Sequence, residues 1–138
     1  MYELLAPSSE GQNYVYAAYI LDQYLAGNIS AQAGQLATWE AVLDPGSTNV
    51  NSSGGGDFYT NFSNTFTADA NSFLTAMYDS GIGGFTGAGY KIARNPVGSA
   101  PGTNYQDCII SVPDASIMFL LGPALLGLGL LGRRKSKK

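Results

Sequence analysis

Residues 11–44 read GQNYVYAAYILDQYLAGNISAQAGQLATWEAVLD. In the first half of this stretch apolar side chains recur at spacings of three and four, which indicates an amphipathic helix between Gly11 and Gly27. The expected buried stripe of this helix consists of Tyr14, Ala17, Ala18, Leu21, Tyr24 and Leu25. Gly27-Asn28 should end the helix, because these two residue types are common where a helix stops.

The second half of the stretch predicts another helix, from Ala31 to Leu43. Ser30 is a suitable N-cap, because its hydroxyl can accept a hydrogen bond from a free N–H of the first turn. The sequence Asp44-Pro45-Gly46 should end this helix. Only a short connection separates the two helices, which favours an antiparallel helical hairpin. The side chains that we expect to be buried on the second helix are Leu36, Trp39 and Leu43.

A third helix and two strands follow the hairpin. Thr67 can cap a helix from Ala68 to Asp79, whose inward side chains would be Phe73, Leu74 and Met77. Residues 90–94 and 105–111 have the alternation and the β-branched and aromatic residues of strands. We therefore expect an α+β domain in which the helical hairpin packs on a short antiparallel sheet.

Two segments rich in small polar residues and glycine separate these elements. Residues 46–56 contain Ser, Thr, Asn and Gly with Val50 as their one apolar residue, which is typical of a flexible surface loop. Residues 82–89 are rich in glycine, but no Lys follows in the register of a phosphate-binding loop. The glycines are better explained by a turn that needs positive φ angles.

Composition limits the kinds of partner that the domain can have. The chain has 138 residues, which is enough for one small domain, residues 1–111, followed by a C-terminal segment, residues 112–138. Residues 1–116 contain all 10 acidic residues and two of the seven cationic ones, a net charge of −8. Because such a domain would not release counterions from phosphate, we expect no binding to nucleic acid.

The C-terminal segment has three parts in a fixed order. A short polar motif comes first, Val112, Pro113, Asp114, Ala115 and Ser116. An apolar run, residues 117–132, follows and is just under the length of about 17–25 residues expected of a membrane-spanning helix. Five cations complete the segment: Arg133, Arg134, Lys135, Lys137 and Lys138. This order predicts a single transmembrane helix with a basic stop-transfer end in the cytoplasm, and a domain across the membrane.

The C-terminal segment resembles the sorting signal of the PEP-CTERM family of bacterial proteins. The resemblance rests on the motif at 112–116, the run Met118-Phe119-Leu120-Leu121-Gly122 and the Arg133-Arg134 end. It implies cleavage by an exosortase-type membrane peptidase and a place at the cell surface or in the extracellular matrix of a Gram-negative biofilm former. The commonest family motif has Glu-Pro where this chain has Asp114-Ala115, so the resemblance implies a sorting enzyme with its own preference.

The resemblance also implies that the protein is exported across the membrane. The start of the chain lacks the features of an export signal. An export signal needs cations followed by an apolar stretch, and residues 1–7 have no cation. We therefore expect the chain to be truncated at its N-terminus. A small, permanently anchored single-pass membrane protein is a further alternative.

A second resemblance involves the helical hairpin. Residues 17–21 and 35–40 are similar to the core of bacterial surface thioester domains, in which a Gln at the position of Gln35 joins an upstream Cys. No cysteine precedes Gln35 in this chain, and Cys108 is its single cysteine. The alternatives are a covalent adhesin whose Cys lies further upstream, or a Gln35 that makes buried hydrogen bonds. For Cys108 we expect a small buried strand residue, with an intermolecular disulfide or a reactive thiol as alternatives.

The residues needed for catalysis are not recognisable in the sequence. The chain has no histidine, no cluster with metal-ligand spacing and no nucleophile beside an obvious base, so we expect neither enzyme activity nor a cofactor. Asp22, Glu40 and Asp44 could meet across the hairpin, but carboxylates on helix exteriors are usually solvated. Exopolysaccharide or another matrix component is a possible partner, and the aromatic residues that could stack on sugars are Tyr14, Tyr16, Tyr19, Phe58 and Tyr59.

Overall fold

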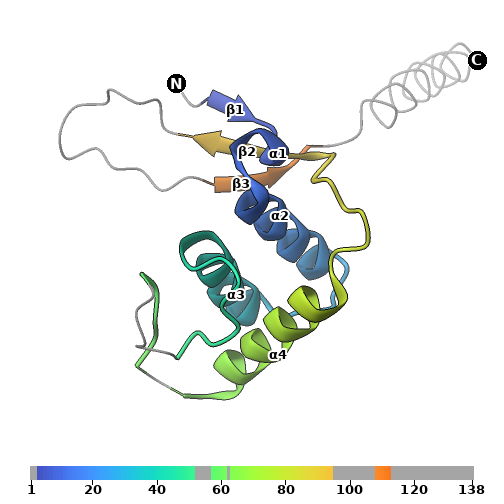
Figure 1. Ribbon diagram of the computed structural model, residues 1–138. Helices are drawn as coiled ribbons and strands as arrows, with labels where there is room; N and C mark the ends of the chain where they lie inside the picture. The colour runs from blue at the N-terminus through green and yellow to red at the C-terminus, as the bar shows by residue number, and fades with distance from the viewer. Residues whose placement is uncertain (1–2, 52–56, 62, 95–107, 113–138) are drawn as a thin grey trace, which may run out of the picture.

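The computed structural model describes residues 3–51, 57–61, 63–94 and 108–112, and within them it shows an α+β domain (Figure 1). Four helices and three strands occur in these residues. In chain order they are β1 (Glu3–Leu5), α1 (Pro7–Glu10), α2 (Gln12–Leu25), α3 (Ala31–Leu43), α4 (Thr65–Ser80), β2 (Tyr90–Arg94) and β3 (Cys108–Ser111). The predicted α+β class, the antiparallel sheet and the helical hairpin α2–α3 are confirmed, but the hairpin packs mainly against α4 and not on the sheet as predicted. The apolar run 117–132 lies outside the described residues, and none of the described helices is long and apolar enough to span a membrane.

The sheet is antiparallel and has the strand order β1-β2-β3. Its central strand β2 places Ile92 opposite Leu5 of β1 and opposite Ile109 of β3. The sequence indicated β2 and β3 but not β1, because three residues are too few to show an alternating pattern. Of the strand expected over 105–111, the part from Cys108 onward is described and is confirmed.

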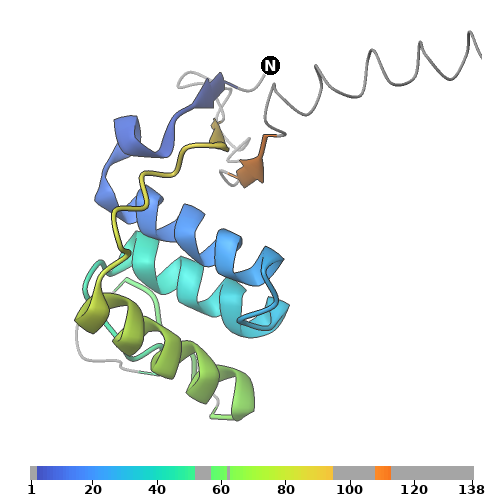
Figure 2. The same ribbon diagram turned by 90° about the vertical axis from the view of Figure 1, so that its right-hand side faces the viewer.

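The helices α2, α3 and α4 form a layer of their own, here called the helical layer (Figure 2). Helix α3 contacts α2 on one side and α4 on the other. Its buried apolar residues are all alanines, which allows the neighbouring helices to come close. The core of the layer consists of Ile20, Ile29, Ala33, Ala37, Ala41, Val50, Ala70, Leu74 and Met77.

The expected burial of α3 is largely wrong. Leu43 is 48 % exposed, and Leu36 and Trp39 are only half-buried. The fully buried stripe consists instead of Ala33, Ala37 and Ala41. A helix with neighbours on two sides buries the residues at the closest approach, and only small side chains fit there, so the large apolar residues lie at the margins.

Helix α2 shows a related difference at its C-terminal end. Tyr24 is 44 % exposed and Leu25 is 58 % exposed, although both belonged to the expected stripe. Val15 and Ile20 are buried in their place, while Ala17 and Ala18 are buried as predicted.

Helix α4 begins three residues earlier than predicted, and its N-cap is Asn64 rather than Thr67. The Asn64 side chain accepts a hydrogen bond from Thr67 N at 3.1 Å, and Thr67 Oγ1 accepts one from Asn64 N at 3.0 Å. Thr67 therefore completes a capping box from inside the helix. Leu74 and Met77 are buried as predicted, and Phe73 is half-buried.

The sheet joins the helical layer through a few specific contacts rather than through a broad interface. Tyr90 of β2 donates a hydrogen bond from its hydroxyl to Asp22 Oδ1 of α2 at 2.8 Å. The ring of Phe85 packs edge-on against Tyr19 of α2, with centroids 5.4 Å apart. It also packs in a tilted arrangement against Tyr90, with centroids 5.9 Å apart. Arg94 of β2 forms an ion pair with Glu10 of α1. The hairpin thus packs mainly against α4, and the sheet lies at the end of α2 and beside α1 (Figure 1).

The glycine-rich turn before β2 has the conformation that the sequence predicts. Gly83, Gly84, Gly87 and Gly89 all have positive φ. At Gly87 a side chain is also excluded by space, because a Cβ there would lie 3.0 Å from Pro7 Cβ. The turn therefore brings β2 against α1 as well as reversing the chain.

Candidate functional site

The predicted sorting motif begins directly after the last described strand. Val112 directly follows β3, and its backbone N donates a hydrogen bond to Gly89 O at 2.7 Å. This bond is the last one that the structure describes along β3, and the next residue, a proline, has no N–H to donate. The side chain of Val112 is 40 % exposed. The rest of the C-terminal segment lies outside the described residues. It comprises the remainder of the motif (113–116), the apolar run (117–132) and the basic end (133–138).

The two residues considered for thioester chemistry are both exposed. Gln35 lies on α3 with its side chain in solvent, so the expectation that it makes buried hydrogen bonds is wrong. Cys108 is the first residue of β3, and the expectation that it is buried is wrong as well. The two residues belong to different layers of the fold, α3 of the helical layer and an edge strand of the sheet. Sequence reasoning missed their exposure because α3 buries its alanine stripe and β3 is paired on one side only.

The three carboxylates considered together separate into two places. Asp22 accepts the hydrogen bond from the Tyr90 hydroxyl, at the junction of α2 and the sheet. Burial, followed by the hydrogen bond and the charge of Asp22, raises the pKa of Tyr90 to about 12. Glu40 and Asp44 are close enough for their charges to interact, at the end of α3. Asp22 is therefore part of the attachment of the sheet and not of a site with Glu40.

Glu40 is a buried carboxylate, although the sequence predicted a solvated one. It is only 1 % exposed. Its Oε1 accepts a short hydrogen bond from the Ser47 hydroxyl, whereas its Oε2 is buried without a hydrogen-bond partner. Burial raises the pKa of the Glu40 carboxyl, the bond from Ser47 lowers it in part, and the Asp44 carboxylate raises it further. An acid in these surroundings binds its proton more tightly than it does in the unfolded chain.

Tyr78 of α4 is a second buried polar group near Glu40. Its hydroxyl is buried without a hydrogen bond of good geometry, although the Gly46 backbone lies close to it, and its ring meets Tyr16 of α2 edge-on with centroids 5.1 Å apart. Burial raises the pKa of the Tyr78 phenol, the backbone of Gly46 lowers it in part, and Tyr16 and Glu40 raise it. Glu40 on α3 and Tyr78 on α4 thus place two incompletely satisfied polar groups near the loop that follows α3.

Residues 46–51 do not behave as the expected flexible loop. Val50 is fully buried in the core of the helical layer. Its N–H donates to Asn71 Oδ1 at 2.9 Å, and its carbonyl accepts from Thr60 N at 2.7 Å. The one apolar residue of a polar stretch is therefore an anchor, which its isolated position in the sequence could have indicated.

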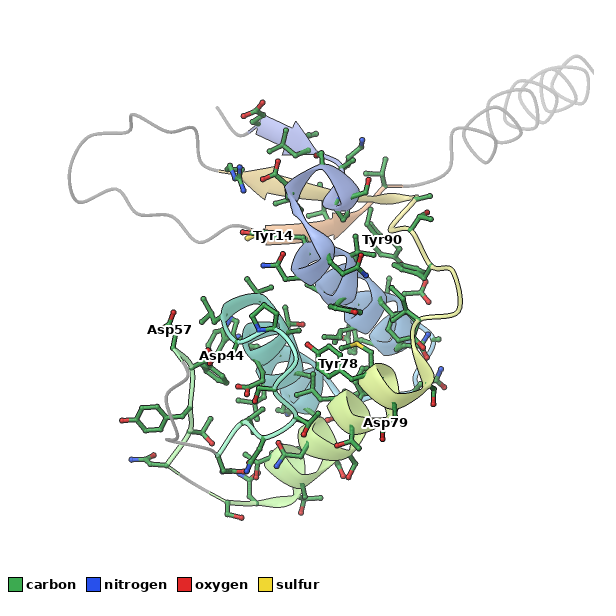
Figure 3. The ribbon with its side chains drawn as sticks, in the orientation of Figure 1. Tyr14, Asp44, Asp57, Tyr78, Asp79 and Tyr90 are labelled. Carbon is green, nitrogen blue, oxygen red and sulfur yellow. The ribbon has the colours of Figure 1, made fainter. Side chains whose placement is uncertain are left out.

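The Asp44 carboxylate holds the far end of the same loop. Its Oδ1 accepts a hydrogen bond from Asp57 N and its Oδ2 accepts one from Phe58 N, each at 2.7 Å (Figure 3). Phe58 in turn packs edge-on against Trp39 of α3, with ring centroids 5.5 Å apart. These contacts give Glu40, Asp44 and Tyr78 a structural explanation, and among the described residues no three potential metal ligands gather.

The aromatic residues considered for sugar stacking are mostly part of the packing. Tyr16 and Tyr19 contact Tyr78, Phe73 and Phe85 within the domain. Of the five residues considered, Tyr59 is the exposed one, at 58 %. The described residues therefore do not present a row of aromatic rings to solvent.

The chain matches no known protein family, no curated protein and no solved structure in the comparisons made.

Proposed function

We propose that this chain is an exported bacterial surface or extracellular-matrix protein whose C-terminal segment is a sorting signal cleaved by an exosortase-type membrane peptidase. The domain at residues 1–111 has a structural or adhesive role in this proposal, and residues 112–138 serve as the substrate of the peptidase. After cleavage the domain is at the cell surface or in the matrix of a Gram-negative bacterium. Exopolysaccharide and other matrix components are the partners that we propose for it.

The observation that carries the proposal is the position of the motif directly after β3. The described hydrogen bonds of the sheet stop at Val112, the first residue of the motif. Among the described residues, every member of the hydrophobic core of the helical layer lies before Val112. A protease that acts beside the membrane could therefore cut after the domain has folded, without unfolding it.

The composition of the C-terminal segment supports the same proposal. Residues 115–132 contain no charged side chain. As a helix, residues 117–132 would be about 24 Å long, somewhat less than the roughly 30 Å of a bilayer core. The five cations beyond residue 132 oppose transfer of the C-terminus across the membrane.

The experiment that tests the proposal compares two variants in a Gram-negative host that has an exosortase. Both chains are placed behind a cleavable export signal, and their C-termini are determined by mass spectrometry. The double variant Pro113→Ala/Asp114→Ala should remain full-length in the membrane fraction, because the motif that the peptidase recognises is lost. The matched control Ser136→Ala, in the basic end, should be shortened like the parent chain. A shortened double variant would contradict the proposal.

A further inference from the structure

The two faces of the sheet differ in what covers them. Directly paired residues of antiparallel strands share a face, and neighbours along a strand alternate between faces. Ile92 is fully buried, and with its partners Leu5 and Ile109 it defines the covered face. The opposite face, here called the outer sheet face, carries Leu4, Lys91, Ala93, Cys108, Ile110 and Val112.

The outer sheet face leaves apolar side chains in solvent. Leu4 is 57 % exposed, and Ile110 and Val112 are each 40 % exposed. Helix α1 lies on the other side of the sheet in both views (Figures 1 and 2). Exposed apolar side chains that gather on one face commonly mark a contact surface.

The charge of the outer sheet face is opposite to that of the domain. Lys91 is its one charged residue, and Lys91 and Arg94 are the only cations of residues 1–116. Glu3 is opposite Arg94 and so lies on the covered face. A cation among apolar side chains suits a lipid surface, where the stem packs on hydrocarbon and the ammonium reaches phosphate.

The length of the chain between the sheet and the apolar run sets how far the outer sheet face can be from the membrane. Four residues separate Val112 from Ile117. A fully extended chain over this interval spans at most about 17 Å. The strand β3 with Val112 is itself about 13 Å long. While the apolar run is in the bilayer, Val112 is therefore at most about 17 Å from the start of that run, and the far end of β3 at Cys108 is at most about 30 Å from it.

We propose that the outer sheet face lies on the outer lipid surface of the membrane as long as the sorting signal is uncut. This inference rests on the proposed function, since the inserted tail supplies the tether. Three partly exposed apolar side chains bind a bilayer weakly by themselves, but a tether of four residues gives them a high effective concentration at the surface. Cleavage removes the tether, and the domain then leaves the lipid. The cut thus controls membrane docking of the sheet as well as covalent anchoring.

Cys108 provides the probe, because it is the only cysteine of the chain and lies on the outer sheet face. The full-length chain is labelled there with an environment-sensitive fluorophore and reconstituted into vesicles of phosphatidylethanolamine and phosphatidylglycerol that carry a quencher near the headgroups. The control is Cys108→Ser/Ala68→Cys, labelled at an exposed position in the first turn of α4, which lies far from the sheet (Figures 1 and 2). We expect at least threefold stronger quenching at position 108 than at position 68. Equal quenching at the two positions would overturn the inference.

Two further readouts keep the outcomes distinct. The variant Leu4→Ser/Ile110→Ser should lose most of the quenching at position 108, whereas Ser111→Ala, on the same strand but the covered face, should retain it. Circular dichroism shows that each variant is folded. Resistance to carbonate extraction reports whether the tail is inserted. An inserted chain without quenching at position 108 overturns this inference alone, and a chain that does not insert overturns the proposed function as well.

Discussion

The helical layer and the sheet are covered to different extents. Helix α3 has neighbours on both sides and buries a stripe of alanines, whereas the sheet is covered on one face and leaves Leu4 and Ile110 in solvent on the other. The helical layer therefore contains most of the burial that stabilises the domain. The sheet contributes less to stability, and its edge strand β3 directly precedes Val112, the first residue of the proposed sorting motif. The stability of the domain and the placement of the proposed sorting signal thus depend on different parts of the fold.

The largest effect is expected from a cavity in the helical layer. Leu74→Ala removes a fully buried side chain and should lower the free energy of unfolding by about 3 kcal/mol. Leu4→Ala, at a 57 % exposed position of the sheet, is the matched control and should cost less than about 1 kcal/mol. Urea denaturation followed by circular dichroism measures both. Equal losses for the two variants would contradict the assignment of stability to the helical layer.

A gain in stability is expected from neutralising the buried acid of the helical layer. Glu40→Gln keeps an acceptor for Ser47 and removes the charge from the unpartnered oxygen, so it should stabilise the domain by about 2 kcal/mol at pH 7. The pKa of Glu40 is raised in the folded state, so its contribution favours folding below the unfolded pKa of about 4.3 and is lost as the pH rises through the folded pKa. Ser47, Asp44 and Tyr78 interact with the same carboxyl and remain in the variant.

The measurement for Glu40 is the difference in unfolding free energy between parent and variant from pH 3 to pH 8. This difference should be small at pH 3 and should grow in favour of the variant as the pH rises. Asp57→Asn, at an exposed carboxylate, serves as the control and should give a nearly constant difference. If Glu40→Gln is less stable than the parent at pH 7, the surroundings of Glu40 compensate its negative charge and the prediction is wrong.

A smaller and local effect is expected where the sheet joins the helices. Tyr90→Phe removes the hydrogen bond to Asp22 and should cost about 1 kcal/mol. Because the folded pKa of Tyr90 is about 12, this bond is present below pH 10, the unfolded value, and is lost as the pH rises toward 12. Amide hydrogen exchange should become faster in β2 and β3 while that of α3 changes little. Acceleration of equal size in α3 would mean that the two regions do not open separately.

The sequence predicted the elements with strong local patterns. The hairpin was found because Ser30 is a recognisable cap and the apolar spacing of α2 is regular, and the structure confirms that Ser30 accepts from Ala33 N. The start of α4 was not found, since Asn64 and Thr67 are both suitable caps and only the reciprocal hydrogen bonds show which is outside the helix. The strand β1 has no pattern of its own and forms because β2 offers it an edge.

Burial was harder to predict than the elements themselves. The alanines of α3 and the isolated Val50 are buried because of what packs against them from distant parts of the chain, and local periodicity does not contain this information. The burial of Glu40 also depends on the loop that follows α3. Ser47 of this loop donates a hydrogen bond to Glu40, and Asp44 accepts one from Asp57 at the far end of the loop. By contrast, the proposed sorting signal is a linear motif, so the whole of it was predicted from sequence, and the structure adds that the described sheet ends at its first residue.

The most direct test of the central claim is the mass of the C-terminal fragment of the parent chain, exported in two otherwise identical hosts with and without the exosortase. The account predicts that the chain loses its apolar run and basic end only in the host that has the peptidase, with a new C-terminus within residues 112–116. It also predicts that the shortened domain unfolds at the same urea concentration as before cleavage. A chain that keeps Lys138 in both hosts would contradict the account and leave a permanently anchored membrane protein.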